Sequence, residues 1–243
     1  MKNKQEKIIK INNLLLERYG EPFRQKNLPG PVDMLIATIL SQNTNDANSF
    51  RAYNNLKANI NGWEDIVDIK QQKLEKIISV AGLAKQKAAA IKNFIKTNIR
   101  EQKKISLDYV RDMNEQDAIS NLTRFKGVGV KTASCVLLFA LDRNVCPVDT
   151  HVHRIVNRLG IVEATTPDKT FYQLNENFPE KIAHQFHTNL IKLGREICKP
   201  AKPSCAICPI KKHCVFTGKN FDKNITAKKR EFMLLDNVEP AGN

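Results

Sequence analysis

The sequence feature that most restricts the fold is a group of four cysteines near the end of the chain. They are Cys198, Cys205, Cys208 and Cys214, separated by six, two and five residues. Four thiolates at such short intervals suit a [4Fe–4S] cluster, which takes four cysteine ligands. Tetrahedral zinc is the alternative, although structural zinc sites commonly use two short cysteine pairs, and this spacing fits that arrangement poorly. If all four thiols bind one metal centre, the loops between them fold around it.

The charge balance of the chain indicates an anionic partner. Its 243 residues carry 39 Lys and Arg against 25 Asp and Glu, a formal net charge of +14. Nucleic acid is the usual polyanion bound by so basic a protein, although a generally basic proteome gives the same balance. Hydrophobic residues make up 42% of the chain, which is enough to build a core.

No apolar run in the sequence is long enough to cross a membrane, and the polar, lysine-rich residues 1–10 do not form a signal peptide. We therefore expect a cytoplasmic, DNA-associated protein. Thiols stay reduced in that compartment, so the cysteines need another explanation than disulfides.

Apolar residues recur at helical spacing along almost the whole chain. Ile8, Ile11 and Leu15 are an example, and the longest predicted helix covers residues 85–100. No segment shows the sustained alternation that is typical of a strand. The sequence therefore predicts an all-α fold. Residues 218–243 mix lysine, asparagine and acids, and we expect them to form a flexible tail.

Two glycines one residue apart join two of the predicted helices. A helix over residues 115–124 leads into Gly127-Val128-Gly129, and a helix over residues 131–141 follows. Glycine accepts a positive φ and lets a partner approach the backbone. The unpaired N–H groups and partial positive charge at the start of the second helix suit a phosphate. A Gly-x-Gly turn alone is also a common helix stop, but a helix on each side favours nucleic-acid contact.

Lys131 lies in the first turn of that second helix and is a candidate nucleophile. The positive helix end disfavours an ammonium ion, and a neutral amine forms Schiff bases with sugar aldehydes. A plain phosphate contact is the alternative role. Further along, Asp149 in the segment 147–154 can cap a helix that runs to Arg158 and ends at Gly160.

The hairpin lysine, the Val148-Asp149-Thr150-His151 segment and the cysteine spacing, in this order, resemble the endonuclease III family of helix–hairpin–helix DNA glycosylases. The resemblance runs from about Pro31 to Cys214. It implies a [4Fe–4S] cluster at the four cysteines. It also implies a monomer that binds double-stranded DNA containing a damaged base or an abasic site.

The resemblance implies a domain plan as well. Two helical domains would flank a DNA-binding cleft. A six-helix domain carrying the hairpin would span residues 26–135. An iron–sulfur domain would combine residues 1–25 with residues 136–217.

In the chemistry of this family, the target base swings out of the duplex into a pocket. The resemblance assigns the attack on the anomeric carbon to Lys131. It assigns to Asp149 the stabilisation of the cationic sugar and help in deprotonating the lysine. β-Elimination from the imine then cuts the strand. Members that only remove bases generally lack this amine, so Lys131 implies a bifunctional glycosylase and lyase, and the family implies oxidised pyrimidines as substrates.

Further residues are expected to contact DNA by the same resemblance. Ser41–Asp46 is similar to the family's Ser-x-Gln-x-x-Asp loop, whose amide enters the duplex void. Asn43 aligns with the family glutamine and Gln42 precedes it, so either amide is a candidate. Gly82-Leu83 resembles a second loop with a wedging apolar residue, for which a core leucine is the alternative. The remaining candidates for DNA contact are Gly127, Gly129, Thr132 and His151.

The cysteine loops also carry several basic residues. These residues either bind DNA phosphates or form a solvated surface without a specific partner. These residues are Lys199, Lys202, Lys211, Lys212 and His213. Two rival functions stay open: a monofunctional or mismatch-specific glycosylase, and a catalytically silent DNA-binding protein on the same scaffold. The joint presence of Lys131 and Asp149 speaks against the silent protein.

Overall fold

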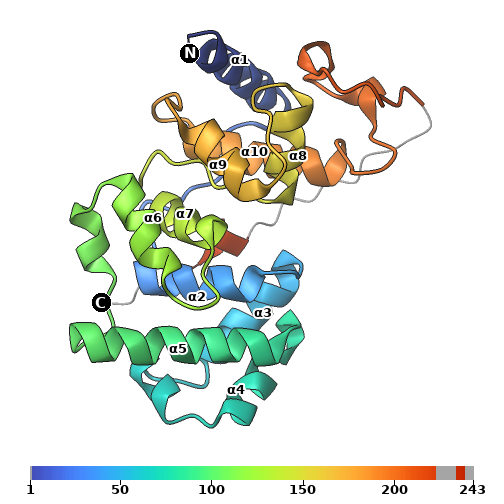
Figure 1. Ribbon diagram of the computed structural model, residues 1–243. Coiled ribbons are helices and arrows are strands. Elements are labelled where there is room, and N and C mark those ends of the chain that lie inside the picture. Colours follow the sequence, from blue (N-terminus) through green and yellow to red (C-terminus); the bar gives the residue numbers. More distant parts are fainter. Residues whose placement is uncertain (1, 223–233, 239–243) are drawn as a thin grey trace. The chain divides into compact units, whose positions relative to one another are not determined.

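The computed structural model describes residues 2–222 and 234–238, and within these residues every regular element is a helix (Figure 1). The predicted all-α fold is therefore confirmed. The chain divides into two compact units. We call Gln25–Asp142 with Phe232–Asn243 the hairpin unit, and Met1–Arg24 with Arg143–Glu231 the cysteine unit. Among the described residues, no helix is long and apolar enough to cross a membrane.

The hairpin unit is built around helix α2, Pro31–Ser41. Residues 31–40 of this helix are all buried, as expected for a helix that is apolar on nearly every face. Helices α3 and α7 make the largest contacts with it. The α-helices of the unit in the described residues are α2, α3 (Asp46–Lys57), α4 (Gln71–Ile77), α5 (Ala84–Gln102), α6 (Glu115–Thr123) and α7 (Val130–Phe139).

Short 3-10 turns connect these helices: η1 (Trp63–Val67), η2 (Ser79–Ala81) and η3 (Asp108–Asp112). Local capping chemistry sets several helix starts. The side chain of Asn45 accepts a hydrogen bond from the N–H of Asn48 at the start of α3, and Asn114 does the same for α6. Pro31 occupies the first turn of α2, where its missing N–H costs nothing.

Two details differ from the sequence-based expectation. The expected boundary at residue 135 falls inside α7, and the units instead divide after Asp142, because the whole of α7 packs on α2. The expected flexible tail includes η6 (Leu234–Asn237), which packs on α2 and α3. The Gln25 amide donates to the carbonyls of Asp236 and Val238, and Val238 is fully buried. Residues 223–233 and 239–243 of that tail lie outside the described residues.

The cysteine unit joins the first helix to the last part of the chain. Helix α1 (Lys2–Tyr19) packs on α10 (Ala183–Glu196), and its apolar stripe of Ile8, Ile11 and Leu15 is fully buried. Helix α10 also packs on α8 (Thr150–Arg158), which in turn contacts α9 (Pro167–Asn175). The short turns η4 (Cys205–Ile207) and η5 (Lys211–His213) follow.

Candidate functional site

The hairpin between α6 and α7 uses its two glycines for different purposes. Gly127 has a φ of +89°, and a Cβ there would lie 2.7 Å from the Cβ of Ala90 on α5. A side chain is therefore excluded by both conformation and space. Gly129 has a φ of −99°, and a Cβ there would meet no atom within 4 Å. Packing does not explain this second glycine, which leaves its backbone open to a partner.

Lys131 lies in the first turn of α7 and is partly exposed. Gly129 precedes the helix and offers no capping side chain, so the first amides of α7 have no acceptor from that position. Within the described residues, the Lys131 amine makes no hydrogen bond or ion pair. The amine and the uncapped helix end therefore form an unoccupied cationic surface beside the hairpin.

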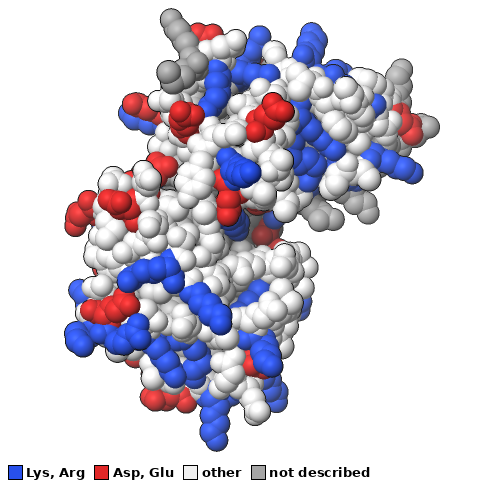
Figure 2. Space-filling model, viewed as in Figure 1, with Lys and Arg blue, Asp and Glu red and all other residues white. Residues whose placement is uncertain are grey.

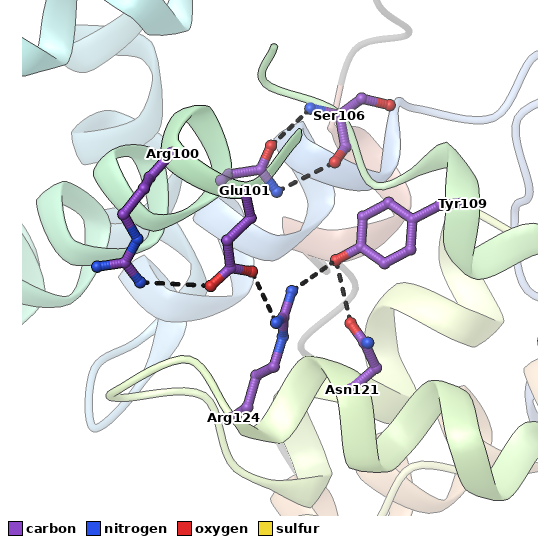
Figure 3. A network of polar contacts seen from close by, with 7 residues as sticks. Arg100, Glu101, Ser106, Tyr109, Asn121 and Arg124 are labelled. Atoms are coloured by element: carbon purple, nitrogen blue, oxygen red, sulfur yellow. Dashed lines mark hydrogen bonds and ion pairs between the residues drawn. The ribbon is translucent and has the colours of Figure 1, made fainter. Parts of the chain in front are cut away.

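A polar network fixes the helix that leads into the hairpin (Figure 3). Arg124, at the end of α6, forms a 2.7 Å ion pair with Glu101 at the end of α5. It also donates to the Tyr109 hydroxyl on η3, and that hydroxyl donates to the Asn121 amide oxygen at 3.0 Å. These contacts tie α6 to both α5 and η3, so the entry to the hairpin is held from two sides.

The two amides of the predicted void-filling loop have different environments. Gln42 follows the end of α2, and its Nε2 donates to the carbonyl of Gly127 at 3.1 Å and to the Thr132 hydroxyl at 3.3 Å. Asn43 is exposed, and its backbone is left-handed with a φ of +51°. Its side chain makes no hydrogen bond within the described residues. Gln42 therefore holds the hairpin, while Asn43 is presented to solvent.

This arrangement changes the expectation for Thr132. Its side chain is only 2% exposed, and its hydroxyl accepts the hydrogen bond from Gln42. The sequence suggested direct DNA contact at this position. In the structure the side chain instead lies inside the hairpin unit, because the first turn of α7 faces α2.

Leu83 is exposed and held in an unusual conformation. Its side chain is 46% exposed and its φ is +50°, in the left-handed region that leucine rarely adopts. The alternative of a core leucine is therefore wrong. Strained residues persist where the surrounding structure holds them, and they are common at ligand-contact sites.

Lys87 lies one turn after Leu83 on α5, and it is buried. Its Nζ donates to the carbonyls of Leu40 and Ala81 at 2.8 and 2.9 Å. Burial lowers the pKa of Lys87 to about 8. No role was predicted for this lysine from the sequence, although its position on the apolar stripe of α5 with Ile91 and Phe94 indicated that it is buried.

In the cysteine unit, Asp149 caps helix α8 through a single oxygen. Its Oδ1 accepts from the backbone N–H groups of His151 and Val152 at 2.9 and 2.8 Å. Within the described residues its Oδ2 accepts no hydrogen bond, and the side chain is partly exposed. The predicted cap is present, and one oxygen remains available for other chemistry.

His151 lies against helix α10. A Cβ at Gly194 would lie 2.7 Å from the Cβ of His151, so glycine permits this close approach of α8 and α10. The Arg154 guanidinium lies 3.1 Å from Nδ1 of His151. Burial is the first cause that lowers the pKa of His151, ahead of a raising effect from Asp149. DNA contact by His151 stays a prediction.

The four cysteines of the C-terminal motif line one pocket, together with Ile155, Leu193 and Ile210. Burial raises the pKa of the Cys208 thiol to about 12; the backbone N–H of Ile210 lowers it, and the other three thiols raise it. The surroundings of the Cys208 sulfur therefore disfavour its thiolate form. No group of three or more His, Cys, Asp or Glu side chains in the described residues is arranged to hold a single metal ion.

Two arginines of α8 hold the loop that begins at Cys198. Arg154 donates from Nε and Nη2 to the Cys198 carbonyl at 2.9 and 2.7 Å. Arg158 donates to the Cys198 sulfur at 3.3 Å and to the carbonyls of Lys199 and Pro200 at 2.9 Å. The helix that Asp149 caps is thus fastened to the cysteine loops. No role was predicted for either arginine from the sequence.

Basic side chains are distributed over each unit on the face shown in Figure 2, with acidic side chains among them. In the cysteine loops, Lys199, Lys202, Lys211 and Lys212 are exposed, as expected for either a phosphate-binding or a solvated surface. Lys126 and Lys131 lie beside the hairpin glycines.

Comparison with known proteins identifies the class to which this helical fold and glycine hairpin belong. The model of the HhH-GPD superfamily of base excision DNA repair proteins matches residues 36–180. An Arabidopsis thaliana relative is 38% identical over 80% of this chain, and the chain spans 65% of that longer protein. The chain belongs to this superfamily.

Within the superfamily, the chain belongs to the endonuclease III family. Endonuclease III of Thermotoga maritima is 33% identical over 82% of this chain and 90% of its own length. A trapped endonuclease III–DNA covalent intermediate has a TM-score of 0.74 and 25% identity, covering 87% of this chain and 95% of that one. The protein is therefore a base-excision DNA glycosylase of this family.

Proposed function

We propose that the protein is a bifunctional enzyme that removes damaged pyrimidines, of the oxidised class, from duplex DNA and then cuts the strand at the abasic site. The observation that carries this proposal is the partly exposed Lys131 amine in the first turn of α7, directly beside the open backbone of Gly129. The hairpin would bind a phosphate through these backbone amides and hold the nucleotide for the amine.

The proposed reaction uses the two candidate residues in sequence. Neutral Lys131 Nζ attacks C1′ of the flipped nucleotide while the bond from C1′ to the base breaks and the base leaves with its electron pair. Asp149, through its free Oδ2, stabilises the positive charge on the sugar and takes up the proton that the attacking amine loses. Opening of the C1′–O4′ bond, with a proton going to O4′, gives an imine between C1′ and Nζ.

Strand cleavage then follows from the imine. The electron-poor C1′ makes the C2′ proton acidic, and its removal expels the 3′ phosphate as the C3′–O bond breaks. Hydrolysis of the imine by water releases Lys131. A monofunctional glycosylase would instead use water at C1′ and form no imine, so the covalent adduct separates the two functions.

The four cysteines are proposed to hold a [4Fe–4S] cluster. Four thiols that line one pocket have the right chemistry for this group. The six- and five-residue gaps between the cysteines fit the two short pairs of a structural zinc site poorly, which favours the cluster over zinc. When bound, the cluster would cross-link the loops, and with all four positions filled by protein it leaves none for substrate.

Borohydride trapping tests the proposed function. Reduction of the imine during turnover should link the protein to a duplex containing one oxidised pyrimidine, and peptide mapping should find the link on Lys131. Lys131→Gln should abolish both the link and strand cleavage. Its affinity for damaged duplex should change by no more than about 1–3 kcal/mol, the scale of one charged hydrogen bond.

Lys126→Gln is the matched control, because Lys126 is an exposed lysine at the same hairpin and outside α7. This variant should retain the trapped adduct. Base release without any adduct in the unaltered protein would instead identify a monofunctional glycosylase. A link on Lys126 would identify a different nucleophile.

A further inference from the structure

Lys87 is a lysine in an unusual place. Its side chain is 2% exposed, and within the described residues it has no acidic partner. Burying an ammonium ion without a countercharge costs stability, and lysines rarely tolerate it. An apolar side chain of similar length would fill the same space, so the presence of lysine needs an explanation other than packing.

The two acceptors of Lys87 are the carbonyls at the ends of two helical segments. Leu40 belongs to the last turn of α2, directly before Ser41, Gln42 and Asn43. Ala81 ends η2, directly before Gly82 and Leu83. Carbonyls at helix C-termini lack intrahelical partners and carry partial negative charge, which a buried ammonium satisfies. One side chain therefore joins the starting points of two loops that are 40 residues apart in sequence.

Both loops present a residue in the left-handed conformation just beyond the joined carbonyls. Asn43 has a φ of +51° and Leu83 a φ of +50°, and both side chains are exposed. Such conformations persist only where the surroundings fix them. The α2 and α5 helices pack against each other and bring the two loops to the same part of the hairpin unit (Figure 1).

We propose that Lys87 is a positioning residue that clamps these two loops together, so that Asn43 and Leu83 enter a distorted duplex as one preformed unit. This inference rests on the proposed function, in which residues of these loops fill the void left by the flipped nucleotide. Lys87 itself does not touch DNA, because it is buried. It acts by keeping the two side chains at a fixed separation before DNA arrives, which lowers the ordering cost of binding.

The test measures discrimination, the ratio of affinities for a duplex with a tetrahydrofuran abasic-site analogue and for the same undamaged duplex. Lys87→Met removes all N–H donors while keeping an unbranched chain of similar length. Discrimination should fall about tenfold, a loss on the scale of one or two charged hydrogen bonds, while affinity for undamaged duplex stays unchanged. Lys87→Arg restores donors for both carbonyls and should recover part of the loss.

A double-mutant cycle separates positioning from general stability. In an Asn43→Ala/Leu83→Ala background there is nothing left for the clamp to position, so adding Lys87→Met should change discrimination less than twofold. Amide hydrogen exchange should accelerate in residues 42–45 and 82–85 of the Lys87→Met protein and remain unchanged in α7. Lys96→Met, the same substitution at an exposed position of α5, should have no effect.

Each outcome has a distinct meaning. The positioning role of Lys87 would be contradicted if Lys87→Met reduced discrimination equally in the two backgrounds. It would also be contradicted if Lys87→Met left discrimination unchanged. If Lys87→Met does not fold, Lys87→Gln, which keeps an amide donor, replaces it in the same cycle. Its loss of discrimination should again be smaller in the Asn43→Ala/Leu83→Ala background. A wild-type protein that shows no preference for the abasic analogue would overturn the proposed function instead.

Discussion

At the scale of the residue, the observed helix cap and the proposed catalytic role of Asp149 fall on different oxygens. Oδ1 receives both N–H groups at the start of α8, and Oδ2 accepts no hydrogen bond within the described residues. A helix cap needs only an acceptor, whereas stabilising a sugar cation needs negative charge. Substitutions that keep the acceptor and remove the charge therefore separate structure from chemistry.

Asp149→Asn should preserve the fold and abolish most of the activity. The amide oxygen can still accept from His151 and Val152, so the thermal midpoint should stay close to that of the wild type. Base excision in single turnover should fall by about 10²–10³, the usual effect of losing one electrostatic group. Asp149→Ala should show the same loss and in addition lower stability by about 1 kcal/mol, because the cap is gone. Wild-type excision by the Asn variant would show that the charge is not needed.

Leu83→Gly should separate stability from recognition. The left-handed backbone costs leucine about 1–2 kcal/mol, a cost that glycine avoids, while glycine loses about 0.5–1 kcal/mol through greater freedom in the unfolded chain. The free energy of unfolding in urea should therefore change by no more than about 1 kcal/mol. Preference for the abasic analogue should nevertheless fall, since the exposed apolar side chain is gone. Leu74→Ala, at a fully buried position of α4, should cost about 2–5 kcal/mol and serves as the contrast.

Residue roles were only partly visible in the sequence. The hairpin glycines and the Asp149 cap follow from local rules, because φ preferences and capping depend on a few neighbouring residues. The hydrogen bond from Gln42 to Thr132 does not follow from local rules, since it joins positions 90 residues apart. The same holds for Lys87, whose acceptors lie on two other segments. Long-range polar contacts leave little trace in a single sequence.

At the scale of the element, the hairpin is a tight turn in which one glycine is packed against a neighbouring helix and the other is not. Gly127 is closed by α5, and Gly129 is open. The network of Arg124 and Glu101 holds the first helix, and Gln42 holds the turn itself. Helix starts and ends near Pro31, Asp149 and Gly160 were predictable, because proline, caps and glycine act locally. The contacts that hold the hairpin to α5 and to the end of α2 were not predictable from the sequence.

The two glycines should therefore respond differently to alanine. Gly127→Ala should lower the free energy of unfolding by at least about 1–2 kcal/mol, the cost of the left-handed backbone alone, because its Cβ also collides with Ala90. Gly129→Ala should leave stability nearly unchanged and weaken binding to undamaged duplex. Urea unfolding and a salt titration of binding measure the two effects. Because the substitution removes no charged side chain, the affinity should fall while the slope of log K against log salt stays close to that of the wild type. Wild-type binding by Gly129→Ala would place the phosphate elsewhere.

At the scale of the whole molecule, the chain forms two units, and in the cysteine unit helix α8 is fastened to the loop that begins at Cys198. Arg154 and Arg158 connect α8 to the Cys198 loop, so the start of α8 at Asp149 and the cysteine pocket belong to one connected structure. The all-α fold was predictable from periodicity alone. The unit boundary was not placed correctly, because it depends on which neighbour α7 packs against.

Metal content tests the role of the pocket. The purified protein should contain about four irons per chain, the complement of one cluster. Cys205→Ala should lose iron and lower the thermal midpoint, since metal binding is coupled to folding. Cys146→Ala is the control, because Cys146 is buried in the same unit and does not line the pocket. Stoichiometric zinc without iron would contradict the cluster.

The composition of the cysteine unit has a consequence for synthesis on the ribosome. Helix α1 emerges well before α10, which supplies the surface that covers Ile8, Ile11 and Leu15. The segment Gln25–Asp142 can collapse before α10 is available to pack on α1, because domains fold as they emerge. Until Ala183–Glu196 has been translated, the apolar stripe of α1 lacks the helix that covers it. Exposed apolar surface on a nascent chain favours aggregation, so we expect chaperones to bind this stripe during synthesis.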